Sequence, residues 1–227
     1  SEAMMKRHIE IFSEVASLGK QKESVAEVAV FADPHSNSYL MDATKVHKSF
    51  NYNCMLGLTK SGMAYDLYNL QDLDKIDSSR YKLCIFLNAF HMTEGELAAA
   101  RSMRSYKLWV YAPNAIKDDG IDYRGISEVT GMNIEMLEGA FDDRLCVDEV
   151  KFGFDSPVTP AFYVNDADAE CLGRYEKSDL VGMAYKNGNF YVACGNIPSS
   201  VWRTVAKKCG VHVYSECDGA LLVDSNF

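Results

Sequence analysis

The sequence has few of the features that would point to a charged or membrane partner. Lys and Arg total 23 against 32 Asp and Glu, for a net charge of −9, and the short basic clusters are Lys6-Arg7 and Lys207-Lys208. Nucleic-acid binding needs clustered basic residues, so we expect no nucleic-acid partner. No apolar run approaches the ~20 residues of a membrane-spanning helix, and no signal-peptide core is visible. We therefore expect no membrane span.

Motifs for metals and cofactors are also missing. The five histidines show no HxH, HxxxH or HExxH spacing, and the glycines form neither GxGxxG nor GxxxxGK[ST]. The pair Asp166-x-Asp168 is too short for a calcium loop. We expect no metal site and no cofactor.

The seven cysteines form no CxxC pair, and most lie in apolar runs, as Cys84 and Cys194 do. They are therefore expected to be reduced core thiols rather than a disulfide framework or a zinc site. Cys84 lies within a predicted strand, where burial disfavours a reactive thiolate. Reduced thiols favour a cytoplasmic location, but an excised domain would carry no signal peptide of its own. The compartment is left unknown.

Two parts are predicted along the chain, residues 1–24 and residues 25–227. Residues 1–4 (SEAM) are typical of a vector remnant before a native Met, which would fit a domain excised from a larger protein. Residues 5–18 place Ile9, Phe12 and Val15 on one helical stripe that Gly19 ends, so a docking helix is expected. Residues 25–227 are expected to form one α/β domain.

The first half of this domain alternates strands with helices. Its strands are continuous apolar runs, a pattern typical of parallel sheets that helices cover on both faces. A Thr93-x-x-Glu96 capping box begins one helix. The predicted strands are 27–33, 65–70, 81–87 and 107–111, and the predicted helices are 44–61, 93–104 and 123–130.

The second half is rich in strands. Asn187-Gly188 between two β-rich runs predicts a tight hairpin. Pro198 and Gly210 flank one further predicted helix, 199–209. The predicted strands are 160–164, 180–186, 189–194, 211–214 and 220–224. The fold class is therefore α/β, a three-layer sandwich with extra strands in its C-terminal part.

Several segments together resemble a known family. They are VAVFADPHSNSYL at 28–40, GMAYDLY at 62–68, Asp72-Leu73, YKLCIFLNAF at 81–90, YAPN at 111–114, LGRY at 172–175 and GVHVY at 210–214. The pattern resembles the amidotransferase-like domain, also called the trimerisation domain, of glycoside hydrolase family 42 β-galactosidases. The resemblance covers most of residues 25–224.

This resemblance implies a flavodoxin-like fold of the class I glutamine amidotransferase type. In such enzymes the hydrolytic carboxylates belong to a preceding (β/α)₈ barrel, and this domain helps to assemble a trimer and to shape the active-site entrance. The chain has too few βα units to form that barrel itself. The expected partners are therefore the barrel domain of a parent glycoside hydrolase and further copies of the chain.

A working amidotransferase would hold a nucleophile on the turn after the fourth strand. Small flanking residues allow that strained turn in a Gly-x-Cys-x-Gly or Gly-x-Ser-x-Gly elbow. Residues 111–115 read YAPNA, with no Cys, Ser or Gly. We therefore expect no catalytic residue in this domain.

The acidic residues suggest no hydrolytic site either. Paired carboxylates are frequent by chance in so acidic a chain, although glycosidases do need such a pair. Solvated turns are the expected place of three pairs: Asp118-Asp119, Asp142-Asp143 and Asp166-x-Asp168.

A candidate groove is predicted where the strands end, because open α/β sheets bind ligands at the carboxyl ends of their strands. Its predicted lining is Asp33, His35, Ser36, Asn88, Phe90 and Asn114, with His91 nearby. The alternative is that these loop residues cap helices or touch a partner domain. Several aromatic residues at strand ends are candidates to face a partner or a sugar ring: Tyr39, Tyr65, Phe90 and Tyr111.

Three functions are weighed on these grounds. The first is a non-catalytic assembly domain of a β-galactosidase-like enzyme. The second is a carbohydrate-binding or sensing module that takes a saccharide in the groove. The third, an active cysteine amidotransferase, would need a Cys at an elbow, and none of the seven is placed at one.

Overall fold

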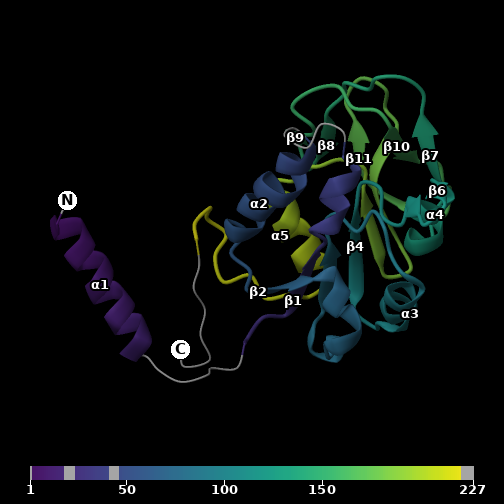
Figure 1. Cartoon of the computed structure of the whole chain (residues 1–227). Coiled ribbons are helices and arrows are strands. Elements are labelled where there is room, and N and C mark those ends of the chain that lie inside the picture. The colour runs from purple at the N-terminus through teal and green to yellow at the C-terminus, as the bar shows by residue number, and fades with distance from the viewer. Residues whose placement is uncertain (1, 18–23, 41–45, 221–227) are drawn as a thin grey trace. The chain divides into compact units, whose positions relative to one another are not determined.

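The computed structural model describes residues 2–17, 24–40 and 46–220 (Figure 1). Contacts divide the chain into two units, Ser1–Val25 with Leu222–Phe227, and Ala26–Leu221. Helix α1 (Glu2–Ser17) belongs to the first unit and matches the predicted helix, whereas Gly19 lies outside the described residues. None of the described helices is both long and apolar enough to cross a bilayer.

Five parallel strands form one half of the main sheet in the second unit. They are β1 (Val28–Ala32), β2 (Tyr65–Asn69), β3 (Leu83–Phe86), β4 (Tyr106–Val110) and β13 (Asn189–Val192), in the spatial order β2-β1-β3-β4-β13. All four residues of β3 are buried, as its continuous apolar run predicts. This flavodoxin-like strand order confirms the predicted fold class.

Helices cover both faces of the parallel strands (Figure 1). On one face α2 (Met55–Thr59) packs against α5 (Ser199–Lys208). The other face carries α3 (Glu94–Ser102), α4 (Arg124–Thr130) and the 3-10 helix η3 (Leu70–Lys75), which α3 contacts. The arrangement is the predicted three-layer sandwich.

Local signals explain most helix ends. The capping box of α3 is present, because Thr93 Oγ1 accepts the Glu96 N–H and the Glu96 carboxylate accepts the Thr93 N–H at 2.8 Å. The predicted helix 44–61 is divided instead into a π-helix, η2 (Lys48–Cys54), and α2. At the start of this segment the side chains of His47 and Asn51 both reach Asn37 Oδ1, at 2.8 and 3.0 Å.

Antiparallel strands extend the sheet beyond β13. The predicted hairpin at Asn187-Gly188 joins β12 (Val181–Lys186) to β13, and both turn residues have positive φ. The sheet continues through β11 (Glu170–Tyr175), β8 (Leu145–Val147) and β9 (Val150–Phe152), while β10 (Ala161–Val164) pairs with β12 and with β7 (Ile134–Leu137). A two-stranded ribbon joins β5 (Ile116–Lys117) to β6 (Gly120–Ile121).

Two predicted strands near the C-terminus differ in the structure. Residues 211–214 form no strand, because their backbone bonds elsewhere: the His212 N–H donates to the Glu27 carboxylate and the Tyr214 N–H to Gly62 O. Of the predicted strand 220–224, Ala220 is not in a strand, and the rest lies outside the described residues.

The core is crossed by a row of aromatic rings. Ring centroids lie 5.8 Å apart from Tyr68 to Phe31, 5.2 Å from Phe31 to Phe86, and 4.1 Å from Phe86 to Trp109. The row therefore links β2, β1, β3 and β4 in their spatial order. Stacked pairs of this kind each contribute roughly 0.5–1.5 kcal/mol beyond the burial of their area.

Candidate functional site

A buried polar network lies at the carboxyl ends of β1 and β3. Asp33 is 3% exposed, and its carboxylate accepts four hydrogen bonds. The donors are the His35 N–H at 3.0 Å, the Ser36 N–H at 2.9 Å, Ser36 Oγ at 2.6 Å and Gln71 Nε2 at 2.8 Å. These bonds fold the loop after β1 back onto the end of the strand.

Asn88 ties this loop to the end of β3. Its Oδ1 accepts the Asp33 N–H at 2.8 Å, and its Nδ2 donates to Asp33 O at 2.7 Å. Ser36 Oγ accepts the Phe90 N–H at 3.2 Å. The polar groups of Asp33, Ser36 and Asn88 thus hydrogen-bond within this network and hold the two loops together. This role is typical of residues that support the shape of a site rather than line it. Direct ligand binding by these three stays a prediction.

The other predicted polar residues are scattered. The His35 side chain is 79% exposed, with Nδ1 3.1 Å from Gln71 Nε2. His91 Nε2 lies 3.0 Å from Asp118 Oδ1, and the Asp118 side chain is 99% exposed, so this contact contributes little to stability. Asn114 is fully buried, and among the described residues neither its Oδ1 nor its Nδ2 has a hydrogen-bond partner.

The residues of the three acidic pairs differ in how exposed they are. Asp118, Asp119, Asp142 and Asp168 are exposed, as predicted. Asp143 is partly buried and accepts the N–H groups of Arg144, Lys177 and Ser178, each within 3.0 Å. Asp166 is likewise partly buried, so the prediction of a merely solvated turn is wrong for these two residues.

Tyr111 lies directly after β4, at the turn considered above for a nucleophile elbow, and its backbone has a positive φ of 65°. Its N–H donates to Val192 O at 2.8 Å, and its carbonyl accepts the Tyr191 hydroxyl at 2.6 Å. Its own hydroxyl donates to Pro160 O at 2.5 Å. Burial, and secondarily the neighbouring Tyr123, raises the pKa of the Tyr111 hydroxyl. A buried, neutral phenol that is already bonded supplies no nucleophile.

The turn that follows packs tightly against α4. A Cβ added to Gly125 would lie 2.0 Å from Asn114 O, a distance that no side chain allows. Gly125 therefore permits the close approach of α4 to the residues after Tyr111. Asn114 itself has a positive φ of 57° and donates its N–H to Ala89 O at 2.8 Å.

The cysteines offer no alternative nucleophile at this edge. All seven are free, and the buried ones are stabilised as neutral thiols. Burial raises the pKa of Cys54 to about 12, of Cys84 to about 11 and of Cys209 to about 12, and it also raises the pKa of Cys194. In the described parts of the chain no three His, Cys, Asp or Glu side chains converge as metal ligands.

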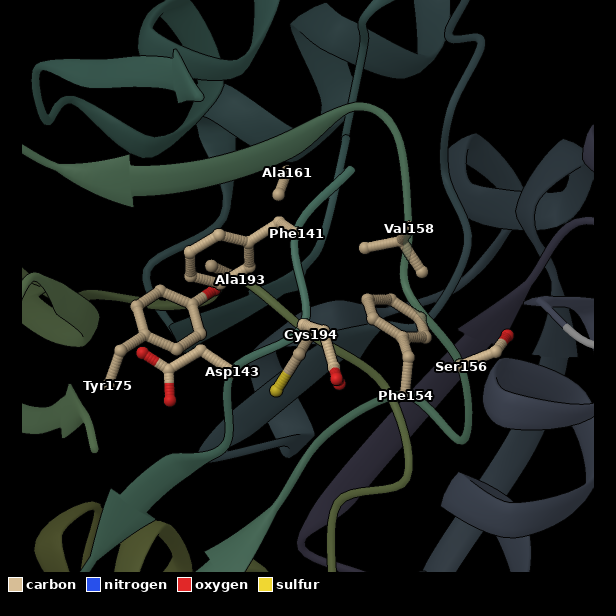
Figure 2. Close-up of a pocket in the computed structure, with 10 residues that line it drawn as sticks. Phe141, Asp143, Phe154, Ser156, Val158, Ala161, Tyr175, Ala193 and Cys194 are labelled. Atoms are coloured by element: carbon tan, nitrogen blue, oxygen red, sulfur yellow. The ribbon is translucent and has the colours of Figure 1, made fainter. Parts of the chain in front are cut away.

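A small interior hollow lies beneath the loops of the antiparallel half (Figure 2). The rings of Phe141, Phe154 and Tyr175 line it together with Cys194, and its volume is about 10 Å³. A space of that size holds at most one water molecule. This hollow is therefore too small to be a ligand site.

A much larger groove lies beside Tyr111, with a volume of about 400 Å³, and we call it the elbow groove. Its lining residues come from several parts of the chain: Tyr39, Leu40, Val46, Phe90, Tyr111, Ala112, Ala115, Ile116, Ile121, Tyr123, Ser156, Pro157, Val158, Thr159 and Pro160. Of the predicted groove residues only Phe90 lies in this lining. Three of the four aromatic residues predicted at strand ends line the elbow groove, and Tyr65 is the exception. Aromatic residues at strand ends were therefore a better sequence signal for this groove than the predicted polar residues.

Comparison with protein-family models and with curated proteins finds no match. Solved structures do match. The β-galactosidase from Halorubrum lacusprofundi is 16% identical, with a TM-score of 0.61 over 92% of this chain and 34% of that one. The enzyme from the psychrophilic Marinomonas ef1 is 11% identical, with a TM-score of 0.60 over 93% and 34%. Gan42B, a GH42 β-galactosidase, is 17% identical, with a TM-score of 0.59 over 82% and 30%.

These similarities define the class of fold. The chain has the fold of a region found within β-galactosidases that include a GH42 enzyme, as the sequence resemblance predicted. It spans about a third of the length of those enzymes. At such low identity, the likeness establishes the fold and leaves the role of this region in the present protein to be proposed.

Proposed function

We propose that this chain is a non-catalytic assembly domain of a larger β-galactosidase-like glycoside hydrolase. The observation that carries the proposal is the state of the elbow. Tyr111 keeps the positive φ of a nucleophile elbow, yet the residue is a buried phenol that donates to Pro160 O. The fold has the geometry of a catalytic turn without a nucleophile on it.

The coverage of the structural matches supports a role within a larger protein. In each of the three β-galactosidases the matching region is about a third of the chain. The proposed partners are a catalytic (β/α)₈ barrel in the rest of the parent chain and further copies of the domain, in a trimer that shapes the active-site entrance. Catalysis then belongs to the barrel.

One edge of the sheet supports an assembly role in physical terms. Among the described strands, β2 pairs with β1 on one side and with none on the other. Leu67 in the middle of β2 is 54% exposed. An unpaired edge with an exposed large apolar side chain is a surface that proteins tend to cover with a neighbour.

Assays of the purified chain with glutamine and with 4-nitrophenyl β-galactoside test the non-catalytic part of the proposal. Neither substrate is expected to be hydrolysed faster than in buffer. As a control for contaminating enzyme, the Tyr111→Phe variant is assayed beside the wild type. If hydrolysis copurifies with the chain and its rate differs in the Tyr111→Phe variant, the proposal is contradicted.

A further inference from the structure

We propose that the elbow groove is a binding site for an uncharged six-membered ring with an apolar face, a pyranose or an aryl group. None of the residues of the β2 edge lines the groove, so this inference does not depend on the proposed function. It rests on the size of the groove, the chemistry of its lining and the way its wall is held.

The size and charge of the groove select the class of ligand. Pockets that bind small molecules usually enclose roughly 300–1,000 Å³, and the elbow groove has about 400 Å³. No Asp, Glu, Lys, Arg or His is among its lining residues, which are mainly apolar and aromatic. A charged ligand would lose hydration there and gain no counter-charge, so an uncharged compound is favoured.

Aromatic side chains form much of the lining. Tyr39, Phe90, Tyr111 and Tyr123 come from four separate segments of the chain and all border the groove. Aromatic faces stack on other rings and on the apolar C–H faces of sugars, and each contact contributes through both area and geometry. This aromatic content distinguishes the elbow groove from an ordinary gap between loops.

The inner wall is fixed before any ligand arrives. Tyr111 is held at its carbonyl by the Tyr191 hydroxyl and at its own hydroxyl by Pro160 O. Phe50 and Phe162 each lie 5.4 Å from the Tyr111 ring, centroid to centroid. A wall that does not need to be ordered on binding lowers the entropic cost of association.

Polar groups remain available around this apolar lining. The hydroxyls of Tyr39, Tyr123 and Ser156 make no hydrogen bond to any described residue. Ser156 lies between the groove and the small interior hollow, and its hydroxyl points away from that hollow (Figure 2). Apolar walls with unengaged hydroxyls suit a ring whose face is apolar and whose edge carries hydroxyl or ether oxygens.

Calorimetric titration tests the site with four probes: galactose, lactose, phenol and phenyl β-galactoside. At least one is expected to bind at millimolar concentration. Binding of galactose and lactose would identify a pyranose site, and binding of phenol an aryl site. Phenyl β-galactoside alone would indicate that both rings are needed. If none of the four binds, the proposal is overturned.

Variants then locate the binding. Tyr39 is 47% exposed, so Tyr39→Ala should fold normally and weaken binding about 5- to 10-fold through loss of one aromatic contact. Ser156→Trp should fill the groove and abolish binding. The matched control is Tyr52→Ala, since Tyr52 is 61% exposed and lies outside the groove. If the Tyr39→Ala and Ser156→Trp variants bind the probe as strongly as the Tyr52→Ala variant does, the ligand binds elsewhere and the proposal is overturned.

Discussion

Tyr111 shows at the scale of one residue how the surroundings hold a strained turn in place. A tyrosine in the left-handed region is strained, and such strain persists only where the surroundings hold it. Here the support comes from hydrogen bonds to Val192, Tyr191 and Pro160. The residue at the elbow therefore serves packing, and its side chain becomes the wall of a groove.

The hydroxyl of Tyr111 should contribute measurably to stability. Tyr111→Phe removes the donor to Pro160 O and is expected to lower the free energy of unfolding by about 1 kcal/mol. Urea denaturation measures the change. Tyr106→Phe is the control, because the described residues offer the Tyr106 hydroxyl no partner, and it should stay within about 0.5 kcal/mol of wild type. Equal stability of the two variants would show that the Pro160 bond contributes nothing.

Asp166 should give the stability a dependence on pH. Hydrogen bonds from Lys186 Nζ, at 2.8 and 3.0 Å, and from the Asn133 N–H lower its pKa. With the folded-state pKa lowered, the unfolded chain binds more protons. The stabilisation is therefore complete above the ordinary aspartate pKa of about 3.9 and is lost as pH falls toward the folded-state value.

Denaturation at a series of pH values between about 6 and 3 tests this linkage. Asp166→Asn should be less stable than wild type near neutral pH, and the difference should shrink as the pH falls below about 4. Asp168→Asn is the matched control, because the Asp168 side chain is 88% exposed, and it should follow the wild-type curve. A constant difference between Asp166→Asn and wild type at every pH would show that Asp166 acts through something other than its charge.

How well the site residues could be predicted from the sequence depended on whether their hydrogen-bond partners lie nearby in the chain. Asp33, Ser36 and Asn88 were picked because they follow strand ends, and the structure does bring them together. What the sequence does not show is that their polar atoms are used up by one another. Such pairing joins residues 55 positions apart and leaves no local pattern.

Replacing two glycines with alanine tests the account at the scale of the elements, because the two substitutions should change the free energy of unfolding in opposite directions. Gly188 has a φ of +84° in the turn between β12 and β13, so Gly188→Ala should destabilise by about 1 kcal/mol. Gly95 lies in α3, where an added Cβ would meet only Thr93 Oγ1 at 4.0 Å. Gly95→Ala should therefore stabilise by about 0.5–1 kcal/mol. Thermal unfolding of both variants measures the signs, and shifts in the same direction would contradict this account of the two elements.

The predictability of the elements follows the strength of their local signals. Strands β1, β3 and β4 have continuous apolar runs, and α3, α4 and α5 have clear starts and stops, so all of these were predicted. Strands β7, β8 and β9 are three or four residues long with mixed exposure, and they were missed. Such short strands are stabilised by their neighbours in the sheet, which a local pattern does not reveal.

The elbow groove was missed for a related reason. Tyr111 follows β4, but Ser156 and Pro160 come from the loop before β10, about 50 residues later in the chain. The loop before β10 belongs to the antiparallel half of the sheet, because β10 pairs with β12 and β7. The hydroxyl of Tyr111 donates a hydrogen bond to the carbonyl of Pro160 in that loop. The lining of the groove therefore comes from both halves of the sheet.

At the scale of the whole molecule, the fold is that of about one third of a β-galactosidase chain, and its described residues form a core and a mixed sheet of 11 strands. On the proposed function, such a unit contributes to a parent enzyme through the surfaces it offers to other domains and copies. The proposed function therefore predicts association of the chain with itself, without turnover.

The most direct test of the central claim is the solution mass of the chain, measured by sedimentation over a wide concentration series. The account predicts that the mass rises with concentration from one chain toward three. Adding galactose to a parallel series shows whether a ligand changes the association. A mass of one chain at every concentration, with and without galactose, would contradict the claim that this domain drives assembly.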